Sequence, residues 1–202
     1  MRTPQPRAAA ALIAILVAGG GCKNDSPTTP SANTLHATST DPAGDAAAVI
    51  GVPVAPDLVR SAIDVTSGLI TLTIQFAPGS MDAQTTRVTV EFDSDQDAAT
   101  GNAVAGPLGV DYSLDLWRGQ ATIMRATPST CASSGQCYTT VGAATLSLGT
   151  DTMTTTLELG AIGNANGRLN YRVGTYVSPS PVAPTPIADW MPDISFSPAH
   201  VP

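Results

Sequence analysis

The sequence predicts an all-β protein with a single antiparallel β-sandwich domain. Three observations support this fold class. Apolar residues recur at every second position in several short segments, which is the spacing of a strand with one buried face. The chain of 202 residues is rich in Gly, Thr, Ser and Pro, and 43% of it is hydrophobic while only 12% is charged. No segment shows sustained helical periodicity, except for one turn around residues 160–164. This composition favours strands over helices.

The strands follow one another at short and regular intervals. The first two, residues 58–66 and 69–76, are separated by Ser67-Gly68, a turn that predicts a hairpin. Further alternating segments cover residues 88–92, 110–116, 121–125, 146–148, 153–159 and 169–175. Eight or so short strands at this spacing indicate a sandwich of the immunoglobulin or jelly-roll kind.

The N-terminal segment has the features of an export signal. Arg2 and Arg7 precede an apolar run over residues 8–18 that is too short to span a bilayer. The run ends in Ala18-Gly19-Gly20-Gly21-Cys22, which resembles the lipobox of bacterial lipoproteins, although Gly19 stands where that motif has an aliphatic residue. We therefore expect lipidation at Cys22 and a lipid-anchored protein of the bacterial cell envelope that faces the periplasm or the exterior. Ordinary signal cleavage is the alternative.

The expected organisation is a signal peptide over residues 1–21, a disordered Ser/Thr/Pro-rich tether over 22–40, the β-domain over 41–195 and a tail over 196–202. Loss of the signal removes two arginines and no acid, so the formal net charge of −7 becomes −9. Such an acidic chain is not expected to bind nucleic acid. Both histidines, His36 and His200, fall in the tether and the tail. With no Gly-x-Ser-x-Gly motif either, we do not expect an enzyme.

An acidic loop follows the segment 88–92. Asp93, Asp95 and Asp97 stand at every second position, and Asp111 lies at the start of the next strand. Carboxylates this close repel one another unless a cation lies between them, and calcium prefers such oxygen ligands. The loop does not have the EF-hand pattern. The four residues are candidate ligands of a structural calcium ion, and the alternative is an Asp-rich turn that caps its own amides.

Two cysteines remain if Cys22 carries lipid. Cys131 and Cys137 flank a short flexible loop in an exported chain, and we expect them to form a disulfide. Near the C-terminus, the segment 189–193 places a Trp between two Asp residues, and we expect its ring to cover the rim of the core.

Five short motifs, in their order along the chain, carry a resemblance to a known family. They are Asp41-Pro42-Ala43-Gly44-Asp45, Pro56-Asp57-Leu58, the segment 92–101, Gly109-Val110-Asp111-Tyr112 and Asp189-Trp190-Met191-Pro192-Asp193. Together they resemble bacterial extracellular β-sandwich domains related to DOMON and to family-nine carbohydrate-binding modules, over residues 41–193. The resemblance implies a sandwich, a structural role for calcium, and binding of sugar or haem. Haem-binding members use a His with a Met, and no His lies in residues 41–195, so we do not expect haem.

Sugar binding requires aromatic rings that stack on the ligand. The candidates are Trp117, Tyr138, Tyr176 and Trp190, and we select Trp117 and Tyr176 as weak ligand-binding residues. Trp117 stands at every second position after Asp111, Ser113 and Asp115, which predicts that it shares their solvent-exposed face of the strand. The alternative is that Trp117 packs under a loop.

The sequence therefore favours a tethered, non-catalytic binding or accessory module, calcium-stabilised, for a polysaccharide or envelope glycan. The alternative is a structural or adhesive lipoprotein that contacts a protein partner.

Overall fold

The computed structural model describes residues 35–49, 51, 54–102, 109–127, 137–164, 166–178 and 186–192, together with the backbone of 199–201. All of them belong to the compact unit that begins at Ala32. Cys22 and Cys131 lie outside the described residues. Lipidation at Cys22 and the disulfide between Cys131 and Cys137 therefore stay predictions.

The described residues form an antiparallel sheet and one short 3-10 helix. The strands are β1 (Leu35–Thr40), β2 (Leu58–Thr66), β3 (Leu69–Phe76), β4 (Thr86–Asp93), β5 (Tyr112–Trp117), β6 (Gln120–Ala126), β7 (Tyr138–Leu148), β8 (Thr152–Glu158), β9 (Leu169–Val177), β10 (Asp189–Met191) and β11 (Ala199–Val201), and the 3-10 helix is η2 (Leu159–Ile162). Their order in the sheet is β1-β2-β3-β8-β7-β6-β5-β4-β9-β10, and β11 pairs with β9.

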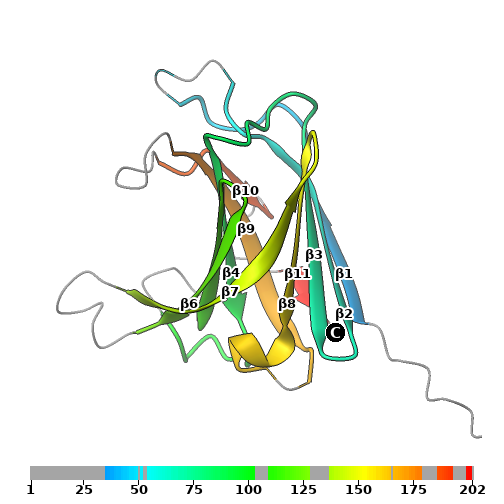
Figure 1. Cartoon of the computed structure of the whole chain (residues 1–202), viewed down its shortest axis with the longest axis vertical. Helices are drawn as coiled ribbons and strands as arrows, with labels where there is room; N and C mark the ends of the chain where they lie inside the picture. Colours follow the sequence, from blue (N-terminus) through cyan, green and yellow to red (C-terminus); the bar gives the residue numbers. More distant parts are fainter. Residues whose placement is uncertain are drawn as a thin grey trace, which may run out of the picture. The chain divides into compact units, whose positions relative to one another are not determined.

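The long strand β7 joins two halves of the sheet. Its first part pairs with β6 and its last part, from Thr145 to Leu148, pairs with β8. Figure 1 shows β7 crossing from the half that contains β4, β6 and β9 to the half that contains β3 and β8. The two ends of the sheet approach one another. β10 contacts β2, and the Leu58 amide donates to Asp189 Oδ2 at 2.7 Å. The sheet is thus nearly closed into a barrel.

One apolar core lies inside the curled sheet. Both halves contribute fully buried side chains, including Leu72 and Ile74 from β3, Val90 and Phe92 from β4, and Leu114 from β5. The alternate residues of β4 and β5 therefore lie on the opposite face of the sheet. That outward face carries most of the candidate site.

The antiparallel all-β class is confirmed. The predicted hairpin of residues 58–66 and 69–76 is present as β2 and β3, and the predicted turn near residue 160 is η2.

Two predicted boundaries are wrong. Residues 35–40 were expected in the tether, but they form β1, which pairs with β2 along its whole length. Residues 199–201 were expected in the tail, but they form β11 against β9. Both are short strands at the margins of the sheet, held by backbone hydrogen bonds to a neighbour rather than by an alternating apolar row of their own.

Candidate functional site

The outward face of β4, β5 and β9 is a continuous row of polar and aromatic side chains, here called the polar face. Its members alternate with the core residues of the same strands and lie opposite one another in the register of the sheet. The polar face consists of Arg87, Thr89, Glu91, Ser113, Asp115, Trp117, Arg172 and Tyr176.

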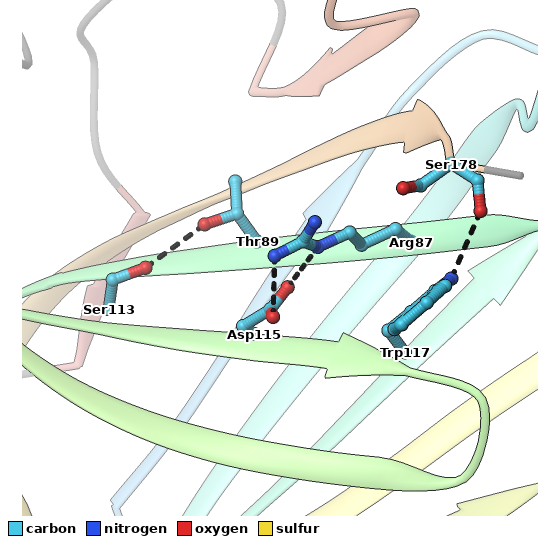
Figure 2. A network of polar contacts seen from close by, with 6 residues as sticks. All are labelled: Arg87, Thr89, Ser113, Asp115, Trp117 and Ser178. Atoms are coloured by element: carbon cyan, nitrogen blue, oxygen red, sulfur yellow. Dashed lines mark hydrogen bonds and ion pairs between the residues drawn. The ribbon is translucent and has the colours of Figure 1, made fainter. Parts of the chain in front are cut away.

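Arg87 and Asp115 form the central ion pair of the polar face. Arg87 Nε donates to Asp115 Oδ1 at 2.6 Å and Arg87 Nη2 donates to Asp115 Oδ2 at 2.8 Å, across the β4–β5 pair (Figure 2). The hydrogen bonds that Arg87 donates to Asp115, together with the negative charge of Asp115, raise the pKa of Arg87 despite its partial burial. A bidentate pair of this kind holds the guanidinium in one orientation. Beside it, the hydroxyls of Thr89 and Ser113 lie 3.0 Å apart.

Two aromatic rings flank the Arg87 guanidinium. Its Cζ lies 5.8 Å from the ring centroid of Trp117 and 5.8 Å from that of Tyr176. Trp117 Nε1 donates to the Ser178 carbonyl at 3.2 Å (Figure 2), and Arg118 Cζ lies 4.3 Å from the Trp117 centroid. Both rings are partly buried, so each keeps some exposed surface. The structure therefore places the two predicted ligand-binding aromatics around one arginine.

A second ion pair continues the polar face along β4. Arg172 Nε donates to Glu91 Oε2, and Arg172 Cζ lies 4.2 Å from the ring centroid of Trp190. Burial raises the pKa of Glu91 more than the Arg172 charge lowers it. A Cβ at Gly174 would come within 2.7 Å of the Trp190 indole, so glycine leaves the space that the ring occupies. Trp190 thus lies over the outward face of β9, and the prediction that it covers the rim of the core is wrong.

The acidic loop begins where β4 ends. Asp93, Asp95 and Asp111 each offer a carboxylate oxygen within 4.8 Å of the others. Asp97 is not part of this group. Its Oδ1 accepts the Ala99 amide at 2.9 Å, and its own amide donates to Asp93 Oδ1 at 3.1 Å and to Asp95 Oδ1 at 2.9 Å. The structure brings together three of the four predicted ligands.

Asp93 and Asp111 have unfavourable electrostatics in the ionised state. Burial raises the pKa of Asp93, and the neighbouring Asp95 and Asp111 raise it further, against the lowering effect of a hydrogen bond from Asn170. Burial likewise raises the pKa of Asp111, with a contribution from Asp95, while Ser94 lowers it. Each carboxylate would be stabilised in its charged form by a cation.

Two glycines allow the loop to fold back on itself. Gly101 has φ +66°, and a Cβ there would lie 2.5 Å from the Val110 carbonyl oxygen. Gly109 has φ +65°, and a Cβ there would lie 2.6 Å from Ala98 Cα. Only glycine accepts both the left-handed conformation and this close approach. The approach sets Asp111 beside Asp95 at the wall of a cavity of about 370 Å³.

The donor set fits a hard cation, since it consists of carboxylate oxygens and Asp95 is exposed to solvent. The amide-capping alternative also has contacts that support it. The Ser94 amide donates to Asp111 Oδ2 at 2.9 Å, and the Thr100 hydroxyl donates to Asp95 Oδ2 at 3.0 Å. These contacts leave further lone pairs on each carboxylate for an ion.

Sequence reasoning identified Trp117, Tyr176 and the acidic residues, but missed Arg87 and Arg172. The alternation along β4 could have identified Arg87, because Arg87 lies on the opposite face of the strand from the apolar residues Val88 and Val90.

No protein-family model fits this chain, and no curated protein is significantly similar to it in sequence. Within the described ranges, no helix has the length and apolar character needed to cross a membrane.

Proposed function

We propose that this protein is an envelope-tethered, non-catalytic β-sandwich module of the DOMON-like kind that binds a polysaccharide or envelope glycan on its polar face and is stabilised by calcium. The observation that supports the proposal best is the arrangement of Trp117 and Tyr176 around the Arg87–Asp115 pair. Sugars combine apolar ring faces with a rim of hydroxyls, so a site for them needs aromatic surface next to fixed donors and acceptors.

The ion pairs give the polar face a fixed geometry before any ligand binds. Arg87 and Asp115 are mostly buried, with side chains 20% and 16% exposed, and Arg172 and Glu91 are buried further. Preorganised polar groups lose less conformational freedom on binding than flexible ones. The face therefore suits a ligand that is recognised by its shape and its hydroxyls.

In this proposal calcium holds the acidic loop in place. Asp93 ends β4, the strand that also carries Arg87, Thr89 and Glu91, so an ion bound by Asp93, Asp95 and Asp111 stabilises the end of the strand that presents the ligand site. Binding to the native state alone raises the free energy of unfolding.

In this proposal Cys22 supplies the membrane attachment, through lipid. The disulfide between Cys131 and Cys137 would close a short loop that leads into β7. Peptide mapping of the exported protein under non-reducing conditions should recover the linked pair. Free thiols at both positions would refute this part of the proposal.

A glycan array tests the function. The purified mature protein should bind a defined group of polysaccharides, with stronger signal in calcium than in a chelator. Binding to no glycan in either condition contradicts the proposal and favours the alternative, a structural or adhesive lipoprotein. The exposed Val141 on β7 is apolar surface that a protein partner could cover, and it would be the first position to probe in that case.

A further inference from the structure

A second group of carboxylates lies where the two ends of the sheet approach one another, here called the seam. Asp41 follows β1, Asp45 lies in the next loop, and Asp189 begins β10. Each of the three offers a carboxylate oxygen within 4.8 Å of the others. They come from two segments far apart in sequence, and none of them takes part in the polar face or the acidic loop.

A fourth carboxylate, that of Asp57, contacts the loop that carries two members of this group, and one of its oxygens has no donor. Asp57 is only 7% exposed. Its Oδ2 accepts the Gly44 amide at 2.7 Å, whereas its Oδ1 is buried and has no hydrogen-bond partner among the described residues. A buried anionic oxygen without a donor is costly, and a bound cation removes that cost.

The contacts of Asp57 direct it towards the seam. Gly44 lies between Asp41 and Asp45 in the chain, so the Asp57 carboxylate is held against the loop that carries both. The next residue, Leu58, donates its amide to Asp189 Oδ2 at 2.7 Å. These contacts place Asp57 between the loop that carries Asp41 and Asp45 and the start of β10.

We propose that the seam binds a divalent, oxygen-preferring cation, with calcium as the best match, through Asp41, Asp45, Asp189 and the unpartnered oxygen of Asp57. Calcium accepts several carboxylates from separate segments in an irregular shell, whereas magnesium requires a near-ideal octahedron and retains its waters. Asp45 is exposed, so an ion can reach the group from solvent, and a cavity of about 280 Å³ borders Asp57 and Ser80.

The ion would close the sheet. The Leu58–Asp189 hydrogen bond and a few packing contacts join β2 to β10 in the described part of the chain, and a cation bound to residues before β2 and at the start of β10 adds a strong link between them. The ion would also hold the segment that follows β1 in place, since Asp41 and Asp45 belong to that segment. The seam ion is independent of the acidic loop and of the proposed glycan binding.

Calcium stoichiometry tests the proposal. Equilibrium dialysis of the full mature chain should show one calcium fewer per chain for Asp45→Asn and for Asp57→Asn than for the wild type. Asp64→Asn is the matched control, because this carboxylate is 46% exposed and lies in neither group, and it should keep the wild-type value. Asp95→Asn should keep the seam ion whether or not the acidic loop binds calcium.

Terbium provides a second readout of the same site. Trp190 directly follows Asp189, so its excitation should sensitise emission from terbium bound at the seam, and Asp45→Asn should abolish this emission. Asp45 is exposed, so its replacement tests the site even if Asp57→Asn does not fold. Wild-type stoichiometry together with wild-type emission in Asp45→Asn would overturn the proposal, as would a wild-type protein that binds no calcium.

Discussion

The Arg87–Asp115 pair provides the sharpest test of how the polar face is built. Asp115→Leu leaves a guanidinium that is only 20% exposed without its bidentate partner. Hydrogen bonds to charged groups contribute about 1.5–3 kcal/mol, so we expect the free energy of unfolding to fall by about 2 kcal/mol. For a chain of this size that corresponds to a decrease in Tm of about 4–8 °C.

A double-mutant cycle separates the pair from its surroundings. Arg87→Met keeps the apolar stem between the two rings and removes the charge, and should also cost about 2 kcal/mol, because Asp115 then loses both donors. The double variant Arg87→Met/Asp115→Leu should cost clearly less than the sum of the single variants, since neither charge is left without a partner. Urea unfolding followed by fluorescence measures all four proteins.

The control for this cycle is Asp64→Asn, which removes an exposed partner of His36 and should change Tm far less. Additive losses in the cycle would mean that the bidentate contact contributes no coupling energy. In that case the geometry of Trp117 and Tyr176 could not be attributed to the ion pair.

Three further predictions follow from the other features. Chelation of calcium should lower the Tm of the wild type, and Asp95→Asn should lose part of this response whereas Asp97→Asn should keep it, because the Asp97 carboxylate lies outside the acidic group. Burial, with the nearby charge of Glu91, raises the pKa of Tyr138 to about 12, so its ionisation disfavours the folded state; the wild type should lose stability relative to Tyr138→Phe as pH rises from about 10 through 12, measured by urea midpoints. Cells fed a palmitate analogue should label the wild type and not Cys22→Ser, and equal labelling would show that the lipobox interpretation is wrong.

The fold class was predictable because the core strands carry their own signal. In β3 the buried residues Ile70, Leu72 and Ile74 alternate with exposed or partly exposed ones, and the turn at Ser67-Gly68 follows directly from composition. The first part of β7 was missed because most of its side chains are exposed on both faces, so no alternation marks it. β1 was missed because its Ser and Thr residues match the composition of a linker.

The candidate site was predictable only where its residues lie two positions apart on one strand and therefore share a face. Asp115 and Trp117 share a phase within β5, so their common face could be read from the sequence. The partners Arg87 and Tyr176 come from other strands, and the register that sets Arg87 opposite both Trp117 and Tyr176 depends on long-range pairing. No local pattern contains that register.

The failure at Asp97 has a local cause. Three aspartates at every second position share a face only in extended backbone. Gln96, between Asp95 and Asp97, has φ 61°, in the left-handed region. The chain therefore turns at Gln96, and Asp97 caps the amide of Ala99 instead of joining the carboxylate group.

The most direct test of the central proposal is affinity electrophoresis of the mature protein through native gels that contain individual polysaccharides. We predict that at least one polysaccharide retards the wild type and the exposed-surface control Val141→Ala equally, and that Trp117→Ala, shown to be folded by its melting curve, migrates as in a gel without polysaccharide. Equal retardation of Trp117→Ala and the wild type, or no retardation of the wild type by any polysaccharide, would contradict a glycan site on the polar face.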